Sequence, residues 1–424
     1  MKKMYFYAAA AAMTLGMSLA SCSKDDVEVP KGDATGGADI VNKGVEPANT
    51  VWPIAEQKAY LDEVGAKMQG KMNFDNLKVY TDMMNEFYSV VSNSNTDRIS
   101  DWVTDTMDEL AEIKGGNKMI STIGLSALQG HWTLSSSGYW RMEDANNLQF
   151  TANLSDGRPC TMSITPSGSK KKVHVMSDEE DGYTMDAYLE VPEHIKVVFT
   201  KNGTDMVVYD LDIDMSLSGD EFYPNKSGMA IKGTVSYANG YKMLVDRVAV
   251  SNSTYGSKIS MVVDGETVAV FKSGAGLENL PSDALSKVQD EEMDIESATT
   301  NLTDFYASVD ILGLVQMKMS VPDVNKFREV VDESKECNYS ESRFKSCVDR
   351  MQSLFEGYVY FNGGTAKQAI LRPVAKWDRY SSVWVTSMAV YMEDGTVVDI
   401  DSYLGNSIFK TFYEMLSDTM WGVI

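Results

Sequence analysis

The sequence has few of the residues from which most enzyme active sites are built. Only three of its 424 residues are histidines and only four are cysteines. It contains no G-x-S-x-G nucleophile motif, no H-E-x-x-H zinc motif and no glycine-rich nucleotide-binding loop. The sequence therefore argues against the hydrolases, zinc peptidases and nucleotide-binding enzymes that a local motif identifies.

Positive charge is also scarce. The chain has 38 Lys and Arg residues against 61 Asp and Glu residues, which gives a formal net charge of −23. The basic run from Lys170 to Lys172 is too short to reverse that balance. Because a chain this acidic repels phosphate backbones, nucleic acid is excluded as a partner, and no cofactor is predicted.

The apolar run near the N-terminus is too short for a spanning helix. Lys2 and Lys3 precede an uncharged, mainly apolar run from Met4 to Leu19, whereas a spanning helix needs about 20 apolar residues. This order of charge and hydrophobicity is typical of a secretory signal peptide, which we place at residues 1–21.

The end of that run, Leu19-Ala20-Ser21-Cys22, resembles the lipobox of bacterial lipoproteins. The resemblance implies cleavage before Cys22 and lipidation of Cys22 with acyl chains such as palmitate, which would anchor the mature chain to a membrane. An ordinary signal peptide with a coincidental cysteine is the alternative. The acidic Asp25 and Asp26 that follow are similar to the export signal of surface lipoproteins in the Bacteroidetes. We therefore expect the cell outer membrane, with its periplasmic and outer faces both left open.

Three cysteines remain after Cys22, so at least one thiol is free or paired between chains. Cys337 and Cys347 can pair if the chain between them folds back, and an exported location permits that bond. A continuous helix through both would hold them about 15 Å apart and forbid it. The sequence favours reduced, packed cysteines at Cys160, Cys337 and Cys347.

The spacing of apolar residues along the sequence changes twice in the N-terminal half of the chain. Residues 22–51 lack a period and are rich in Gly, Pro and polar residues, which predicts a flexible tether. Residues 52–128 have apolar residues at spacings of three and four, which predicts helices. The three expected helices carry Ile54, Leu61, Val64, Met68 and Met72, then Leu77, Tyr80, Met84, Phe87 and Val91, and then Ile99, Val103, Met107, Leu110 and Ile113.

Residues 129–277 alternate with the period of two that is typical of β-strands. We expect an antiparallel meander, because Asn-Gly and Asp-Gly pairs favour the positive φ angles of tight hairpin turns. Its longest strand is predicted from Val207 to Leu217, with odd-numbered residues inward. The predicted turns are Asp156-Gly157, Asn202-Gly203, Asn239-Gly240 and Asp264-Gly265.

Residues 278–424 mix helical and strand patterns. They begin with an acidic, helical stretch, continue with one strand from Phe305 to Val321, and end with a helix from Ile408 to Trp421. The runs Gly364 to Ala369 and Asp401 to Leu404 are similar to a recurring type of Bacteroidetes lipoprotein, an uncharacterised family without an assigned activity. The fold class predicted for the whole chain is α+β, with N-terminal helices, a large antiparallel meander and an α+β C-terminal part.

The carboxylates Asp210, Asp212 and Asp214, with Glu221, match several ligand positions of an EF-hand loop. The sixth position of such a loop must be glycine, and here it is Met215. Apolar residues also alternate straight through the segment. We therefore interpret the three aspartates as the solvated face of a strand, which leaves them a weak candidate calcium site.

The remaining candidate residues are histidines and aromatics. His131, His174 and His194 lie in separate strand-like segments without ligand spacing, so ordinary surface or hydrogen-bonded histidines are favoured. Exposed indole rings can stack on sugars or on a partner protein, although core packing is their commoner use. The tryptophans considered for ligand binding are Trp132, Trp140, Trp377 and Trp384.

These observations favour a membrane-anchored, non-catalytic lipoprotein that acts as a binding or scaffold module for glycan, lipid or an envelope protein. A polysaccharide hydrolase without a local motif is the alternative, because its two carboxylates need to meet only in space. A lipid carrier with an apolar hollow is a further alternative.

Overall fold

A computed structural model describes residues 39–40, 44–99, 101–102, 112–113, 118–125, 127–180, 183–216, 228–250, 254–277, 302–405 and 408–423. These residues form two compact units. The described part of the first unit lies within Asn73–Ser251. The described part of the second lies within Asp26–Met72 and Asn252–Ile424. The N-terminal helical region expected at 52–128 therefore contributes to both units.

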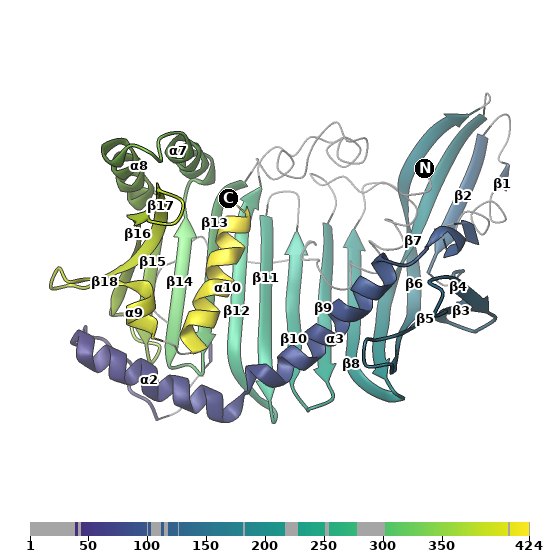
Figure 1. Cartoon of the computed structure of the whole chain (residues 1–424), viewed down its shortest axis with the longest axis horizontal. Coiled ribbons are helices and arrows are strands. Elements are labelled where there is room, and N and C mark those ends of the chain that lie inside the picture. The colour runs from purple at the N-terminus through teal and green to yellow at the C-terminus, as the bar shows by residue number, and fades with distance from the viewer. Residues whose placement is uncertain are drawn as a thin grey trace. The chain divides into compact units, whose positions relative to one another are not determined.

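The protein is mostly β, with strands in a mixed sheet and helices packed beside them (Figure 1). The predicted α+β class is confirmed only in part, because strand residues outnumber helical ones. None of the helices in the described ranges is long and apolar enough to cross a membrane. The helices whose bounds lie within the described ranges are α2 (Ile54–Lys71), α3 (Phe74–Ser92), α7 (Val324–Glu336), α8 (Glu341–Ser353), α9 (Ile400–Leu404) and α10 (Ile408–Val423).

The first unit contains the predicted meander up to Ser251, and the rest of the region predicted at 129–277 belongs to the second unit. Within the first unit, β5 to β10 pair in chain order and antiparallel. Two pairings, β2 with β7 and β3 with β5, are parallel and were not predicted. The strands are β1 (Glu112–Ile113), β2 (Lys118–Gly124), β3 (Gly130–Leu134), β4 (Trp140–Glu143), β5 (Leu148–Asn153), β6 (Pro159–Glu180), β7 (Tyr183–Lys201), β8 (Thr204–Ser216), β9 (Gly228–Tyr237) and β10 (Lys242–Val250).

All four predicted turns connect consecutive strands. Asn202 and Gly203 have φ angles of 50° and 79°, and Asp264 and Gly265 have 50° and 80°, as a type I′ turn requires. In the other two turns only the glycine has a positive φ. The prediction of hairpins from these dipeptides is confirmed.

The core of the first unit forms between α3 and one face of its sheet. Phe87 of α3 is fully buried, and its ring centroid lies 5.8 Å from that of Phe199 on β7. Val207, Leu211 and Met215 of β8 are buried on the predicted inward face. Burial of each such side chain contributes roughly 1.5–3 kcal/mol, so this apolar stripe fixes which face of β8 points inward.

The second unit contains an antiparallel succession from β11 to β18. The single strand expected from Phe305 to Val321 is instead a hairpin, with Leu312 and Gly313 at φ angles of 55° and 67°. The strands are β11 (Thr254–Val263), β12 (Glu266–Leu277), β13 (Leu302–Ile311), β14 (Val315–Val321), β15 (Glu356–Phe361), β16 (Ala369–Asp378), β17 (Val383–Tyr391) and β18 (Val397–Asp399).

Helices pack against the apolar face of this second sheet. Phe412 of α10 contacts Phe271 of β12, with ring centroids 5.4 Å apart. At the other end of the sheet, Gln352 of α8 donates a hydrogen bond to the Pro373 carbonyl of β16 at 2.7 Å. Val309 of β13 and Val359 of β15 are fully buried on this face. We call it the helix face.

The last part of the expected tether lies against the second unit. The buried Gln368 side chain accepts a hydrogen bond from the Trp52 amide at 2.9 Å and donates one to the Thr50 carbonyl at 2.8 Å. Asp310, also buried, accepts hydrogen bonds from the Asp39 and Ile40 amides. These contacts order residues that composition alone assigns to a tether.

Several predictions fall partly or wholly outside the described residues. The expected third helix is described only at its start, through residues 99 and 101–102, and Ile113 at its other end lies in β1 rather than in a helix. The signal peptide with Cys22, residue Glu221 and the acidic stretch before Leu302 lie outside the described ranges.

Candidate functional site

Two of the four candidate tryptophans are core residues. Trp132 is 3% exposed and packs against Trp102, and Trp140 is fully buried and packs against Phe150. The indole Nε1 of Trp140 donates a hydrogen bond to Ser94 Oγ at 2.8 Å. Burial removes both rings from contact with a ligand, so this part of the candidate set is corrected.

The other two candidates form a pair near the end of the β16–β17 hairpin. Trp377 and Trp384 are directly opposite in the register, so their side chains lie on the same face. Their ring centroids are 5.5 Å apart at an interplanar angle of 63°. Trp377 is 43% exposed. An indole pair that is held in place and still open to solvent can accept a flat ligand.

The turn beyond this pair is held by Asp378. Its carboxylate accepts hydrogen bonds from the amides of Tyr380 at 3.0 Å and Ser381 at 3.3 Å and from the Ser381 hydroxyl. The Ser381 hydroxyl, followed by these amides, lowers the pKa of Asp378. Tyr380, in the middle of the turn, is fully exposed. The hydrogen bonds therefore fix the loop from which the Tyr380 ring projects.

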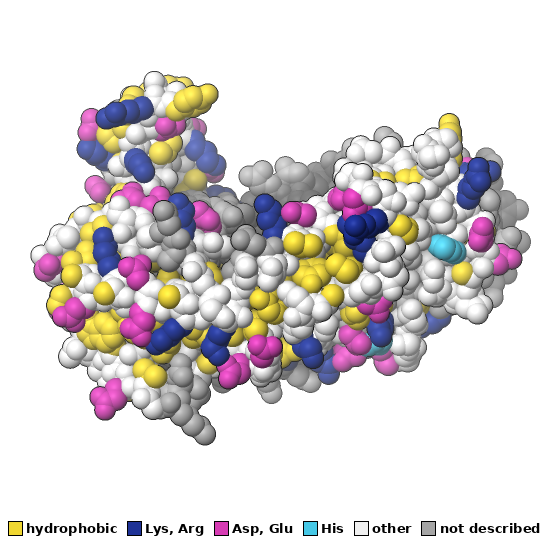
Figure 2. Space-filling view, turned by 60° about the horizontal axis from the view of Figure 1, so that its bottom comes forward, with side chains coloured by type: hydrophobic (Ala, Val, Ile, Leu, Met, Phe, Trp, Pro, Cys, Tyr) yellow, Lys and Arg dark blue, Asp and Glu magenta, His cyan; other side chains and the backbone are white. Residues whose placement is uncertain are grey.

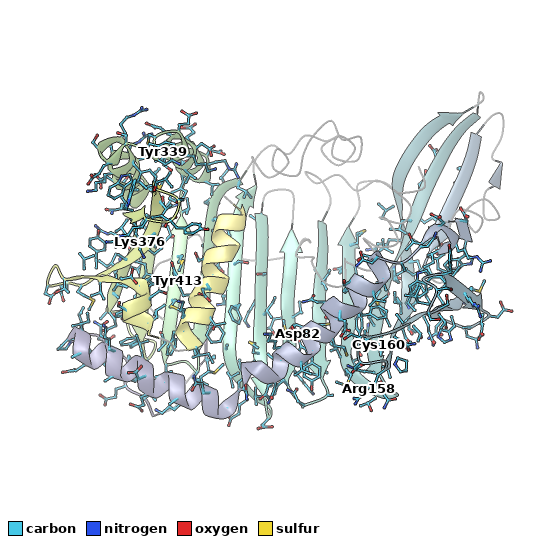
Figure 3. All side chains as sticks on the ribbon, viewed as in Figure 1. Asp82, Arg158, Cys160, Tyr339, Lys376 and Tyr413 are labelled. Atoms are coloured by element: carbon cyan, nitrogen blue, oxygen red, sulfur yellow. The ribbon has the colours of Figure 1, made fainter. Side chains whose placement is uncertain are left out.

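The α7–α8 connection lies against the same hairpin. The Trp384 amide donates a hydrogen bond to the Asn338 carbonyl at 2.8 Å. Lys345 of α8 lies with Nζ 5.2 Å from the Trp384 ring centroid. Tyr339, labelled in Figure 3 near α7 and α8, is 80% exposed. We call Tyr339, Trp377, Tyr380 and Trp384 the aromatic end. Tyr380 is near the tryptophans in sequence, whereas Tyr339 could not be found from the sequence, because only the fold brings the α7–α8 connection to this hairpin.

The two buried cysteines of the second unit face each other across the same connection. The chain folds back between α7 and α8, which brings the Sγ atoms of Cys337 and Cys347 to 3.8 Å. Both are free thiols, as is the buried Cys160. Burial raises the pKa of Cys347 and that of Cys160 to about 11, so both thiols are protonated at neutral pH. The expectation of packed, reduced cysteines agrees with this arrangement.

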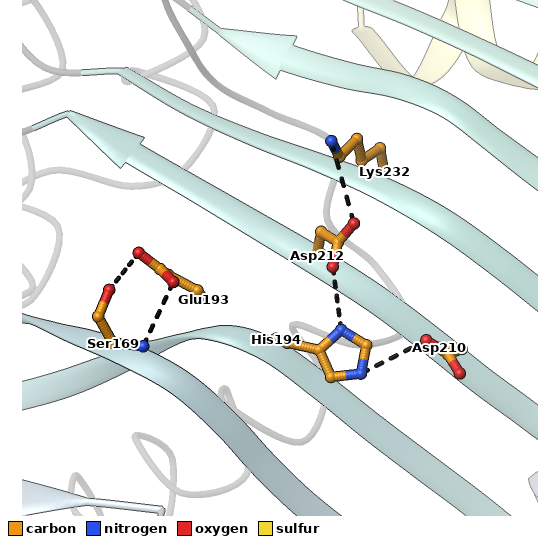
Figure 4. Close-up of polar contacts among 6 residues, drawn as sticks. All are labelled: Ser169, Glu193, His194, Asp210, Asp212 and Lys232. Atoms are coloured by element: carbon orange, nitrogen blue, oxygen red, sulfur yellow. Dashed lines mark hydrogen bonds and ion pairs between the residues drawn. The ribbon is translucent and has the colours of Figure 1, made fainter.

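The three candidate aspartates lie on the exposed face of β8, as the strand interpretation predicted. His194 of β7 lies between two of them, with Nδ1 3.0 Å from Asp212 and Nε2 3.4 Å from Asp210 (Figure 4). Lys232 lies 4.0 Å from Asp212, and Lys171 lies 3.8 Å from Asp214. Asp210 and Asp212 thus share His194, whereas Asp212 and Asp214 each have a lysine neighbour of their own.

Within the described ranges, no group of three or more His, Cys, Asp or Glu side chains is arranged to hold a metal ion. His131 Nε2 lies 2.9 Å from Thr151 Oγ1, and the side chain of His174 is outside the description. On the face of the molecule shown in Figure 2, basic side chains are interspersed with acidic ones. The exposed aromatic end is therefore a more distinctive feature than these mixed charges.

Comparison with known proteins gives no match: no family model, no curated protein and no solved structure is similar to the chain. The function must therefore be argued from the geometry.

Proposed function

We propose that the protein is a lipid-anchored lipoprotein of the cell outer membrane that binds glycans without cleaving them. The signal sequence and the lipobox at Cys22 support the anchor. In this proposal residues 22–51 connect the anchor to the folded units. The aromatic end of the second unit supplies the ligand-binding surface.

The observation that carries the proposal is the pair of indoles formed by the exposed Trp377 and the half-buried Trp384. Indole rings provide a large apolar face with a polar edge, which suits the flat faces of sugar rings. Tryptophan and tyrosine are also the residues that most often dominate binding energies at interfaces. Tyr380 and Tyr339 add two further rings with hydroxyl groups that can donate or accept hydrogen bonds.

The rigidity of the aromatic end supports a role in binding. The hydrogen bonds that Asp378 accepts hold the hairpin turn, and the Asn338 carbonyl holds the backbone at Trp384. Rings placed before the ligand arrives lose little conformational freedom on binding. Aromatic side chains that serve only as core packing are buried, whereas Tyr339, Trp377 and Tyr380 are exposed.

The ionisation of Asp378 rules out this residue as the general acid of a glycosidase. A glycosidase needs one carboxylic acid that remains protonated to donate to the leaving group. The hydroxyl and amide donors around Asp378 lower its pKa, so this carboxylate of the hairpin turn is ionised at neutral pH. It can accept a hydrogen bond from a sugar hydroxyl, but it cannot act as that general acid.

The test is titration of neutral oligosaccharides into the chain from Ser23 onward, measured by calorimetry and tryptophan fluorescence. We expect Trp377→Ala to weaken binding at least tenfold, since a binding contribution of about 1.4 kcal/mol corresponds to a factor of ten. Tyr139→Ala is the matched control, because Tyr139 is an exposed aromatic residue of the first unit. Mass spectrometry of the ligand afterwards should show it intact.

Three results would count against the proposal. Cleaved oligosaccharide would indicate a hydrolase. Equal losses of affinity in Trp377→Ala and Tyr139→Ala would show that the aromatic end is not the site. Absence of binding to every neutral oligosaccharide would leave a protein partner or a structural role as the better hypothesis.

A further inference from the structure

A second set of aromatic side chains crosses the other face of the same sheet. Tyr358 of β15 is opposite Ile370 of β16, and Ile370 is opposite Tyr391 of β17. The register therefore places these three side chains in one line across the strands. We call them the tyrosine row. Neighbouring strands are about 4.8 Å apart, so the two tyrosines are separated by about 10 Å at the backbone.

The tyrosine row lies on the face opposite to the helix face. Along β16, Ala369 and Leu371 are buried, whereas Ile370 between them is half-buried. Tyr358 and Tyr391 are also half-buried. Trp377 lies an even number of residues from Leu371, so the tryptophan pair and the tyrosine row are on opposite faces. The row is thus a surface separate from the aromatic end.

Two cations lie over the rings of the tyrosine row. Lys367 Nζ is 3.7 Å from the Tyr358 ring centroid, and Arg372 Cζ is 5.2 Å from the Tyr391 ring centroid. Neither has an ion pair within the described part of the chain. Other described cations do have a carboxylate neighbour, as Lys335 does with Asp332 at 2.8 Å. The row therefore presents two positive charges that no described carboxylate compensates.

The backbone beneath Lys367 is fixed. The next residue, Gln368, is fully buried, its amide donates to the Val359 carbonyl at 2.9 Å, and its side chain binds the segment before α2. Arg372 lies within β16, which is paired on both sides. Lys367 therefore lies in a connection that Gln368 holds in place, and Arg372 lies in a strand, so a ligand loses little conformational freedom of the backbone when it binds them.

We propose that the tyrosine row binds an acidic polysaccharide that carries carboxylate groups. Lys367 and Arg372 each take one carboxylate, and the Arg372 guanidinium can take its carboxylate through two parallel hydrogen bonds. The sugar rings between the charges lie on Ile370, between the two tyrosines whose ring faces the cations occupy. Binding does not depend on the tryptophan pair, so this inference goes beyond the glycan-binding function proposed above.

The composition of the row favours a polysaccharide over a protein partner. Protein interfaces have an apolar core that excludes charge. Here the row itself contributes one aliphatic side chain, Ile370, and Val397 lies opposite Tyr391 on β18. Two cations over tyrosine rings instead match a polar ligand with regularly spaced anions. Glu356 lies two residues before Tyr358 on the same face. Because its carboxylate repels an anionic ligand, the affinity is lower than the two cations alone would give.

The test uses oligogalacturonate as the probe and calorimetry at low and moderate salt. We expect the chain from Ser23 onward to bind it, with affinity that falls as salt rises. The double variant Lys367→Ala/Arg372→Ala should bind at least tenfold more weakly than the parent. Arg372→Lys should show a smaller loss of affinity, because it keeps the charge but cannot form the two parallel hydrogen bonds. Glu356→Gln should bind more tightly, because it removes the opposing carboxylate.

The control is Lys335→Ala/Arg343→Ala, which removes the same charge from exposed positions on α7 and α8. This control and Trp377→Ala should bind oligogalacturonate as the parent does. Equal affinity of the parent and Lys367→Ala/Arg372→Ala would overturn the proposal. Stronger binding to polyglutamate than to oligogalacturonate would overturn it in favour of an acidic protein partner. Neutral oligosaccharides test the aromatic end separately, so the two proposals can fail independently.

Discussion

The cations of the tyrosine row in the second unit have different neighbours from the cations on the exposed face of β8 in the first. In the first unit Lys232 and Lys171 lie beside Asp212 and Asp214, and His194 bridges two aspartates. In the second unit the cations of the tyrosine row lie over aromatic rings. A carboxylate neighbour compensates a positive charge within the chain, whereas a tyrosine ring leaves most of that charge for a ligand. The net charge of −23 therefore does not predict which positive charges on a face are available to a ligand.

The four candidate tryptophans also differ between the units. Trp132 and Trp140 fill the core of the first unit, whereas Trp377 and Trp384 of the second stay partly open to solvent. All four occur in strands or at their ends, so local sequence does not separate them. The comparison shows that one residue type serves stability in one unit and is available for binding in the other.

The largest effect on stability should come from Trp140→Ala. Loss of a fully buried indole with its hydrogen bond to Ser94 should lower the free energy of unfolding by about 3–5 kcal/mol. Trp377→Ala should lower it by about 1 kcal/mol or less, because the ring keeps much of its hydration in the folded state. Urea unfolding of the two variants measures the difference. Similar losses would mean that the units do not use tryptophan differently.

A smaller effect should come from Asp310, a buried carboxylate of the second unit. Its side chain accepts hydrogen bonds from the Asp39, Ile40 and Gly313 amides. Asp310→Asn replaces one accepting oxygen with an NH2 group and leaves amide donors unsatisfied. The expected loss is about 1–3 kcal/mol, measured by urea unfolding at neutral pH.

The pH dependence of stability should identify the same residue. Burial raises the pKa of Asp310 above its value of about 3.9 in an unfolded chain. The folded state then binds the proton more tightly, so this contribution to stability is full below the unfolded pKa and declines as pH rises through the folded pKa. Asp310→Asn should remove that decline from the pH profile. A profile unchanged in the variant would contradict a buried, titrating Asp310.

The smallest effect should come from the charges on β8. Asp212→Asn removes a carboxylate that is more than half exposed and lies near His194 and Lys232. Exposed ion pairs contribute about 0–1 kcal/mol, so the midpoint of thermal unfolding should barely change. The difference in midpoint between the variant and the parent should become smaller as salt is added, because salt screens the charges. A loss above about 2 kcal/mol would show that these residues form a structural network rather than a solvated face.

The sequence predicted local structure well where one signal dominated. The Asn202-Gly203 and Asp264-Gly265 turns were predictable because their backbone angles strongly favour those residues. The hairpin at Leu312-Gly313 was not, because leucine rarely adopts a positive φ. Its turn is held by distant contacts, including the hydrogen bond from the Leu312 amide to the Val268 carbonyl.

The sequence by itself determined the acidic charge, the candidate anchor at Cys22, the β8 faces and most of the strand order, because each depends on residues close together in the chain. Only the tertiary structure decided which tryptophans are buried and which cations lie over tyrosine rings. Those properties depend on strand register and on elements far apart in sequence, such as α8 against β16 and β17, and no local pattern encodes them.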